Sequence, residues 1–425
     1  MMNIARAGAI LAPPRWLVVM ILHVRRYLHH PAPRAILLRG GLVAGHMAVL
    51  FGLAFMLGLD SFGAAIVLWG LALVGATLLG LGGPLILLAR LGGGQGMHPV
   101  AVLMLCFGLP GGLAAAAYPV LSVVWAGVPW AAVLAAGLAI HLAACLASIL
   151  RAMGSVHLSM VLRDGAPVCA LGLAGMVQAD AGAMMWLAAI ALGLSCGLIA
   201  LICLRQAALH RIIGRGKPRG MVDVGLWASS VMGMALAQVD IILGGQFLTP
   251  EQIGVYALVR RLANLVALPI SVATWVNAGP ISAAHAASDT AALQRASTAG
   301  ADIAIWPGVA LAVLILPLAW WLPVSALPVL LALVGGTLVQ LVFAQGITVA
   351  SLTGRGNLAA RARLAGVVCY LAGATAFAPL DPLGNALAYV LGTSLCGALL
   401  WMWLWRGTGV NTLAFHKGAR AWRMS

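Results

Sequence analysis

Charged residues are scarce in this sequence of 425 residues, of which only 8% are Asp, Glu, Lys or Arg. Ordinary soluble domains contain about 25%, and a soluble chain of this length could not cover its surface with so few. Hydrophobic residues make up 63% of the chain. The composition therefore excludes a soluble globular protein and indicates a polytopic membrane protein, most of whose surface is covered by lipid.

Several familiar functional motifs are missing as well. The sequence has no Walker loop and no HExxH motif, and no stretch between its apolar runs is long enough for a catalytic domain. Its seven cysteines include no CxxC pair and lie in apolar runs, which is typical of helix packing rather than metal binding or disulfide chemistry. We therefore expect no ATP-driven motor, no enzyme activity and no cofactor.

What the sequence does contain is a series of apolar segments near the length that spans a bilayer, about 20 residues. We count twelve of them. They are 41–59, 63–88, 99–118, 128–149, 158–177, 184–204, 223–243, 253–275, 302–322, 326–350, 362–379 and 384–405. The fifth is the weakest, because Arg163 and Asp164 interrupt it near its start.

Basic residues outnumber acidic ones 24 to 9, an excess that in a soluble protein would suggest nucleic-acid binding. With the N-terminus placed inside, 22 of the 24 fall before or at the start of the first span, at the inner connections or in the C-terminal tail. Lys and Arg collect on the cytoplasmic side of membrane proteins. We therefore expect cytoplasmic N- and C-termini and no nucleic-acid partner.

The longest connection is basic and divides the twelve segments into two sets of six. The organisation predicted from this division has five parts. They are an N-terminal cytoplasmic or interfacial segment (1–35), a six-helix bundle (36–204), a basic cytoplasmic linker (205–222), a second six-helix bundle (223–405) and a cytoplasmic basic tail (406–425).

The two halves resemble each other weakly. Gly63 and Gly254 each stand where the second helix of a half is expected to enter the membrane. Six spans per half give both halves the same orientation, related by an axis along the membrane normal. The predicted fold is an all-α polytopic membrane protein of about twelve transmembrane helices in two six-helix bundles related by a pseudo-two-fold. Two unrelated hairpins with a chance glycine are the alternative.

Arg260 and Arg261 are the two basic residues that orientation does not explain, because they lie within the eighth segment. An Arg facing lipid at a helix centre costs about 2.5–3.5 kcal/mol, so both should face protein, water or a ligand. Tyr256, Arg260 and Asn264 recur at intervals of four and form a polar stripe on one helix face. Asp240, in the preceding segment, is expected at a similar depth to one of the two Arg.

Two interpretations fit this cluster. In the first, Asp240 and one Arg form a buried ion pair that only ties two helices together. In the second, one Arg pairs with Asp240 while the other faces a cavity and binds an anion, since the planar guanidinium suits phosphate. We favour the second, because one Arg would suffice for the ion pair. Asp240 is then the leading candidate for coupling to an ion gradient.

Three further polar residues are candidates for substrate binding. Gln238 lies near Asp240 in the seventh segment, Arg39 stands at the expected inner mouth of a cavity, and Gln340 in the tenth segment is placed to contact sugar hydroxyls. Arg39 also fits a positive-inside anchor, and Gln340 also fits a hydrogen bond between helices.

Five stretches together resemble the polysaccharide-biosynthesis flippases, which belong to the multidrug/oligosaccharidyl-lipid/polysaccharide exporter superfamily. Residues 238–244 and 254–263 resemble the seventh-to-eighth helix region of that family, and 280–295 the loop that follows. Residues 148–154 resemble the end of its fourth helix, and 60–63 its first outer turn. The resemblance covers roughly residues 36–405 and lies in the order and spacing of loose motifs.

The resemblance implies a V-shaped bundle with two lobes that alternate access to a central cavity. It also implies a substrate, an undecaprenyl-diphosphate-linked oligosaccharide flipped across a bacterial inner membrane for exopolysaccharide, capsule or O-antigen synthesis. Polysaccharide polymerase and chain-length machinery are implied partners, with membrane lipid. Cavity arginines of the family match Arg260 and Arg261 in type and location. Many relatives have fourteen helices, so this chain departs from them by two.

Three alternatives stay open. A multidrug antiporter of the same superfamily usually holds organic cations with intramembrane acids, and Asp240 is the main deep acid here. A membrane-embedded polysaccharide polymerase or glycosyltransferase generally presents a large outer loop, whereas the outer connections expected here are short. A non-transporting scaffold of a polysaccharide assembly complex is the third.

Overall fold

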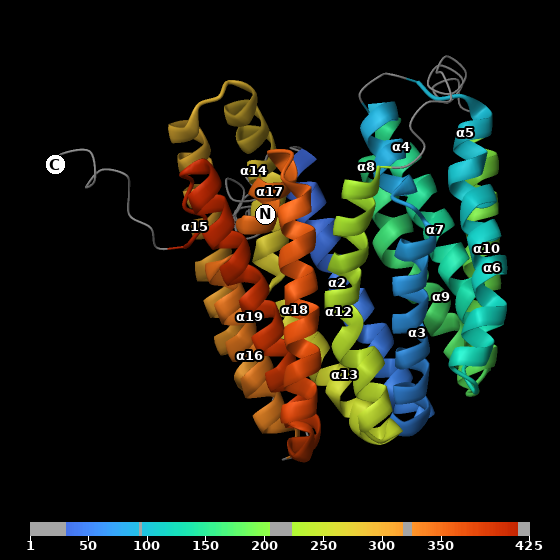
Figure 1. Ribbon diagram of the computed structural model, residues 1–425. Coiled ribbons are helices and arrows are strands. Elements are labelled where there is room, and N and C mark those ends of the chain that lie inside the picture. The colour runs from blue at the N-terminus through green and yellow to red at the C-terminus, as the bar shows by residue number, and fades with distance from the viewer. Residues whose placement is uncertain (1–30, 93–95, 205–222, 318–324, 415–425) are drawn as a thin grey trace, which may run out of the picture. The chain divides into compact units, whose positions relative to one another are not determined.

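A computed structural model (Figure 1) describes residues 31–92, 96–204, 223–317 and 325–414 of the chain. By packing, the chain divides into a short first unit, residues 1–45, and a second unit, residues 46–425. Of the first unit the structure describes only the beginning of one helix. Residues 1–30 of the predicted N-terminal segment (1–35), the predicted linker (205–222) and residues 415–425 of the predicted tail (406–425) lie outside the described residues.

The described residues form helices and no strand. They make up twelve helical segments, each overlapping one of the twelve apolar segments predicted from the sequence. In chain order these are α2 (Pro31–Leu57); α3 (Leu59–Leu79) with α4 (Gly83–Gly92); α5 (Pro99–Leu103), η2 (Met104–Gly108) and α6 (Leu109–Val124); α7 (Trp130–Ala152); α8 (Val156–Met160), η3 (Val161–Gly165) and α9 (Ala166–Val177); α10 (Ala181–Leu204); α12 (Val224–Phe247); α13 (Pro250–Leu265) with α14 (Leu268–Ala286); α15 (Thr290–Ile315); α16 (Ala326–Val342) with α17 (Gly346–Leu352); α18 (Gly356–Ala376); and, after the short η5 (Ala378–Leu380), α19 (Asp381–Thr408).

Most of these segments are long and apolar enough to cross a membrane. Within the described residues nine helices meet that test by themselves, and eleven spans result when each of two bent helix pairs is counted as one. The helix that does not meet it is α18, which carries Arg361 and Arg363 in its first half. The chain is thus an all-α polytopic membrane protein.

Several predicted boundaries were wrong. The ninth segment, predicted at 302–322, is a helix from Thr290 to Ile315, and residues 276–286, predicted outside the spans, continue α14. The start of α15 is fixed by Asp289, whose side chain accepts a hydrogen bond of 2.8 Å from the Ala292 amide. Residues 31–35, predicted to belong to a separate N-terminal segment, lie in α2.

Two π-helical turns interrupt the N-terminal half, at Met104–Gly108 and at Val161–Gly165. Each ends two residues before a proline, Pro110 or Pro167. Proline lacks a backbone N–H and cannot complete the regular helical ladder, so the chain accommodates it with a wider turn. The second turn carries Arg163 and Asp164 on exposed side chains, so these charges interrupt the apolar segment without interrupting the helix.

Two helices of the C-terminal half are bent by 44°, between α13 and α14 and between α16 and α17. The first bend is explained by Pro269 at the start of α14, which removes one backbone donor. At the second bend the residues 343–345 form tight turns instead, with the Phe343 amide bonded to the Gln340 carbonyl at 3.0 Å. These bends place irregular backbone deep within the protein.

Helices α3–α10 pack mainly with one another, and so do α12–α19; the main packing between the two groups is α3 against α12 and α13. The glycines singled out in the sequence lie at this contact. Gly63 is the fifth residue of α3, and a Cβ there would overlap the Pro250 carbonyl oxygen, at the first residue of α13. Gly254 is the fifth residue of α13, and a Cβ there would overlap the Leu59 carbonyl oxygen, at the first residue of α3. The contact is therefore reciprocal, as the predicted pseudo-two-fold requires.

Candidate functional site

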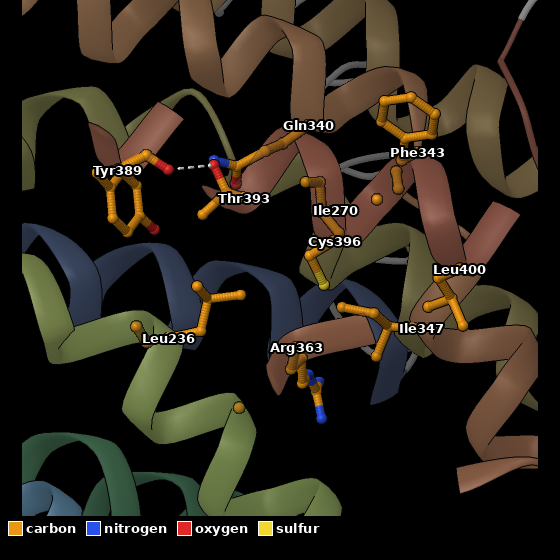
Figure 2. Close-up of a pocket in the computed structure, with 14 residues that line it drawn as sticks. Leu236, Ile270, Gln340, Phe343, Ile347, Arg363, Tyr389, Thr393, Cys396 and Leu400 are labelled. Carbon is orange, nitrogen blue, oxygen red and sulfur yellow. Dashed lines mark hydrogen bonds between the residues drawn. The ribbon is translucent and has the colours of Figure 1, made fainter. Parts of the chain in front are cut away.

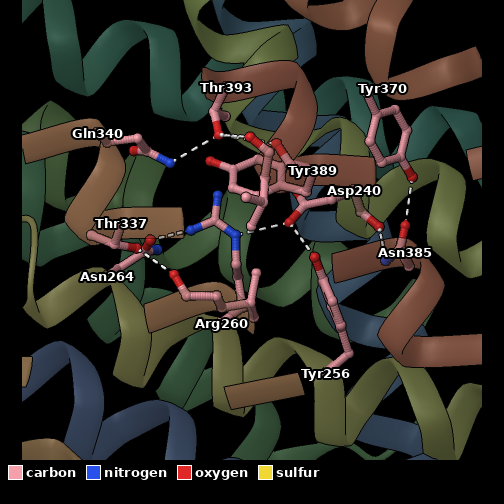
Figure 3. Close-up of polar contacts among 12 residues, drawn as sticks. Asp240, Tyr256, Arg260, Asn264, Thr337, Gln340, Tyr370, Asn385, Tyr389 and Thr393 are labelled. Atoms are coloured by element: carbon pink, nitrogen blue, oxygen red, sulfur yellow. Dashed lines mark hydrogen bonds and ion pairs between the residues drawn. The ribbon is translucent and has the colours of Figure 1, made fainter. Parts of the chain in front are cut away.

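A buried ion pair lies between α12 and α13. The Nε atom of Arg260 donates to Oδ2 of Asp240 at 2.8 Å, and the side chains are 7% and 0% exposed (Figure 3). Asp240 is the one carboxylate buried among the described residues. The ion pair expected from the sequence is therefore present, and Arg260 is the Arg that forms it.

Two other residues of the polar stripe on α13, Tyr256 and Asn264, form hydrogen bonds with this ion pair. The Tyr256 hydroxyl donates to the same Oδ2 atom of Asp240 at 2.7 Å, and the Nη1 atom of Arg260 donates to Oδ1 of Asn264. A capping box at Thr249 and Gln252 fixes where α13 begins. Because the helix starts at that point, residues 256, 260 and 264 stand above one another on the face toward α12, as their spacing of four predicts.

Two helices far along the chain complete the cluster. On α19, the Asn385 side-chain amide donates to the Asp240 backbone carbonyl at 3.0 Å, and the Tyr389 ring lies 3.9 Å from the Arg260 guanidinium carbon. On α18, the Tyr370 hydroxyl donates to Oδ1 of Asn385 at 2.6 Å (Figure 3). A guanidinium over an aromatic face is attracted by the ring's quadrupole. The Arg260 side chain is therefore held by a carboxylate, an amide and a ring.

The sequence interpretation did not identify Tyr370, Asn385 and Tyr389. A signal was present, since Asn385, Tyr389 and Thr393 recur at intervals of four in the last apolar segment. This is the same polar stripe pattern that singled out α13.

A cavity of about 200 Å³ adjoins the cluster (Figure 2). Tyr389, Gln340 and Thr393 line it on the side of the ion pair, and Gln340 donates from Nε2 to the Thr393 hydroxyl at 3.0 Å. The other lining residues are mostly apolar side chains and glycines from α12, α14, the bend between α16 and α17, α17 and α19, together with Arg363 of α18. These are Gly233, Leu236, Ala237, Ile270, Phe343, Ala344, Ile347, Cys396, Gly397 and Leu400. The predicted substrate residue Gln340 thus lies in the wall of a cavity.

Arg261 differs from its neighbour. It is half-buried, and its Nε atom is buried with no hydrogen-bond partner among the described residues. Arg260 repels it electrostatically, and Asp240 attracts it. The second carboxylate oxygen of Asp240, Oδ1, is also buried and unpartnered within the described part of the chain. The site therefore contains one satisfied ion pair together with one buried donor and one buried acceptor that have no partner among the described residues. Arg261 is not among the residues that line the cavity.

The remaining predicted residues lie elsewhere. Gln238 is buried with its Oε1 atom against Gly70, at 3.6 Å from where a Cβ would lie, so it packs at the contact between α12 and α3. Arg39 lies on α2 within the first unit, and its predicted place at a cavity mouth stays a prediction.

A sequence match to a catalytic motif has a structural explanation. Residues 193–197, Gly-Leu-Ser-Cys-Gly, fit the GxSxG pattern of hydrolases. In those enzymes the serine occupies a sharp turn between a strand and a helix. Here Ser195 lies in the middle of α10 and its hydroxyl donates to the Ala191 carbonyl of its own helix at 2.8 Å. It is a helix hydroxyl without the geometry of a nucleophile.

No family model matches the sequence, and no curated protein sequence matches it. Solved structures do resemble it. One, described as the inward-facing conformation of a multidrug resistance MATE family transporter of the MOP superfamily, superimposes with a TM-score of 0.63 over 85% of this chain and 94% of its own, at 14% identity. The fold is that of the MATE transporters. A structure described as the outward-facing conformation of such a transporter gives a TM-score of 0.54 at 16% identity, covering 89% of this chain and 92% of its own.

A further structure, of a MOP superfamily transporter from Pyrococcus furiosus, gives a TM-score of 0.54 at 13% identity, covering 89% of this chain and 92% of its own. That protein is described as having a binding pocket of reverse polarity, which suggests a different function. At these identities the likeness establishes the MATE fold for this chain.

Proposed function

We propose that this protein is a flippase that moves an undecaprenyl-diphosphate-linked oligosaccharide from the cytoplasmic to the outer leaflet of a bacterial inner membrane, by alternating access, for surface polysaccharide synthesis. In this proposal the N- and C-termini are cytoplasmic. The sugar head and at least two negative charges cannot cross a bilayer unaided, whereas the prenyl chain stays in lipid. The protein needs to supply only a basic site for the diphosphate and a change of access.

Arg261 is the observation that carries the proposal. Its neighbour Arg260 already neutralises Asp240 and is held by Asn264 and Tyr389, so the structural need for a cation is met without Arg261. A second guanidinium with a buried unpartnered Nε is costly in a membrane protein unless an anion or water meets it. Arg suits a diphosphate because its planar fork donates two parallel hydrogen bonds.

Asp240 is the proposed coupling group. Its Oδ1 atom is buried and unpartnered, while Oδ2 accepts from both Tyr256 and Arg260. A proton or cation taken up on Oδ1 would weaken the hold of Asp240 on Arg260. Through Tyr389 and Asn264 that change would reach α19 and the rest of α13. Ion uptake on Asp240 would in this way change the contacts between α12, α13 and α19.

The test is flipping of a defined lipid-linked glycan by the purified protein in liposomes. Arg261→Gln should lower the rate at least tenfold with unchanged protein yield, because the diphosphate loses its free guanidinium. Arg361→Gln, a matched change at an exposed Arg of α18, should leave flipping unchanged. Wild-type flipping rates in Arg261→Gln would show that Arg261 binds no anion. Arg260 is a poorer choice for this test, because its loss leaves Asp240 buried without a partner.

A multidrug antiporter is the second candidate, and the fold likeness favours it, since the similar structures include multidrug resistance transporters. Such a protein would need Asp240 to attract an organic cation, yet Arg260 already pairs with that carboxylate and Arg261 stands beside it. Transport of a cationic dye by the same liposomes separates the two. Under the flippase proposal the dye is not transported, and Arg261→Gln does not create such transport.

A further inference from the structure

Arg363 of α18 is the one charged residue among those that line the cavity of about 200 Å³ (Figure 2). Its Nη1 atom donates to the Ser229 backbone carbonyl at 2.7 Å and to the Ser229 hydroxyl at 2.9 Å. No carboxylate in the described part of the chain lies within ion-pair distance of it. The edge of the guanidinium formed by Nε and Nη2 also has no hydrogen-bond partner among the described residues. Arg363 is therefore oriented by α12 and has one donor edge left over.

The guanidinium lies between α12 and α19. On α12, a Cβ at Gly233 would stand 3.0 Å from the Cζ atom of Arg363 and 3.1 Å from its Nη1 atom, so the guanidinium packs against the helix backbone there. On α19, Cys396 interacts electrostatically with Arg363 and lines the same cavity (Figure 2). These two helices also carry Asp240 and Tyr389, which hold Arg260.

The spacing along both helices gives the distance from Arg363 to the buried ion pair. On α12, Gly233 and Asp240 are seven residues apart, and on α19, Tyr389 and Cys396 are also seven apart. An α-helix rises 1.5 Å per residue, so each helix gives a separation of about 10 Å. The cavity therefore has the ion pair near one end and Arg363, without a carboxylate partner, near the other.

The chemistry of these groups limits what the cavity suits. A guanidinium inside a membrane protein is costly unless an anion or water meets it, and its planar edge matches the two oxygens of a carboxylate. A single free edge suits one negative charge, whereas a diphosphate carries at least two. Gln340 and Thr393 in the same wall offer polar groups to hydroxyls. The cavity is smaller than the roughly 300–1,000 Å³ of sites for drug-sized ligands, so the ligand is small.

We propose that this cavity binds an acidic sugar, whose carboxylate is held by Nε and Nη2 of Arg363 and whose hydroxyls contact Gln340 and Thr393. The role of the site in transport rests on the flippase proposal, in which the sugar belongs to the lipid-linked glycan and the diphosphate is held by Arg261. Arg363 then makes the protein selective for glycans that contain a uronic acid.

Cys396 supplies a reporter for this site, because it lines the cavity beside Arg363. The test uses purified full-length protein in which the other six cysteines are replaced by Ala. Anionic sulfonatoethyl methanethiosulfonate should label Cys396 at least tenfold faster than cationic trimethylammonioethyl methanethiosulfonate, after division by the rate of each reagent with free mercaptoethanol. Arg363→Gln should abolish this preference. Arg361→Gln, at an exposed Arg of the same helix, is the matched control and should retain it.

The ligand is tested by protection of Cys396 from the neutral reagent methyl methanethiosulfonate. Glucuronate should protect at a concentration at least tenfold below that of glucose. Arg363→Lys guards against variants that merely fold poorly, because it should keep the preference for the anionic reagent and lose the advantage of glucuronate, since Lys has the charge without the fork. Absence of labelling, equal corrected rates for the two charged reagents, or equal protection by glucose would each overturn the proposal.

Flipping in liposomes separates this proposal from the flippase proposal. The comparison is between two lipid-linked glycans that differ only in a glucuronate or a glucose residue. Arg363→Gln should lower flipping of the acidic glycan relative to the neutral one at least tenfold, whereas Arg261→Gln should lower both. An unchanged ratio in Arg363→Gln would overturn the selectivity. If the wild-type protein flips neither glycan, the flippase proposal fails, and the labelling of Cys396 still decides whether Arg363 binds a carboxylate.

Discussion

The two halves of this protein share one helical plan and differ in what they bury. Among the described residues, the N-terminal half buries the polar side chains of His141 and Ser159, whereas thirteen buried polar or charged side chains lie in the C-terminal half. Both halves cross the membrane with similar apolar helices, so the fold does not require this polarity. The difference teaches that the buried polar groups have gathered in one half, and that the recognition and coupling proposed for this protein would rest on that half.

The sharpest test of that difference removes the central cation of the C-terminal half. Arg260→Leu leaves Asp240 charged and unpaired in the interior, which should cost about 3–5 kcal/mol of unfolding free energy. The measurement is denaturant unfolding of the purified protein in micelles. Adding Asp240→Asn to the same protein should recover much of the loss, because no buried charge then remains. An Arg260→Leu protein as stable as wild type would mean that the polar half is no more sensitive than the apolar one.

A second test asks whether the halves are equivalent where they meet. Gly63→Ala and Gly254→Ala each drive a Cβ into a backbone carbonyl of the other half, so each should lower the unfolding free energy by about 1–3 kcal/mol. Gly112→Ala is the control, since nothing lies near that position, and it should stabilise α6 by about 0.5–1 kcal/mol. A large loss at one glycine beside none at the other would break the two-fold relation.

The smallest effect is expected in the N-terminal half. The His141 Nε2 atom lies 2.9 Å from the Leu105 carbonyl in the first π-helical turn. His141→Leu would leave that carbonyl without its donor, at a cost of about 1–2 kcal/mol. Unfolding in micelles measures it, with Ser195→Ala, at an exposed helix hydroxyl, as a neutral control. A loss as large as that of Arg260→Leu would show that the N-terminal half has a polar centre of its own.

The sequence predicted the helices well because the signal for a membrane span is local. An apolar run of about 20 residues needs no partner to be recognised, and each of the twelve runs overlaps helix in the described part of the chain. The start of α15 was missed because Thr290 to Asp302 is too polar to resemble a span, although Asp289 was available as a capping residue. The bend at residues 343–345 has no proline to signal it.

Only those residues of the candidate site that lie on one helix or on the next helix along the chain were predicted. Tyr256, Arg260 and Asn264 belong to one helix, and Asp240 to its neighbour in the chain, so spacing alone placed them. Asn385, which holds the Asp240 carbonyl, is 145 residues away. Which of two adjacent Arg would pair with Asp240 also depended on how α13 is rotated against α12, and packing determines that rotation. Gln238 faces α3 for the same reason.

The reciprocal contact of Gly63 and Gly254 can be compared with the interface of a symmetric dimer. In a symmetric homodimer, a residue i that touches residue j of the partner implies that j touches i. The pairs Gly63–Pro250 and Gly254–Leu59 obey that rule within a single chain. At these two glycines the boundary between the halves therefore has the pattern of an isologous interface, and a change at either glycine is half of a symmetric interface mutation.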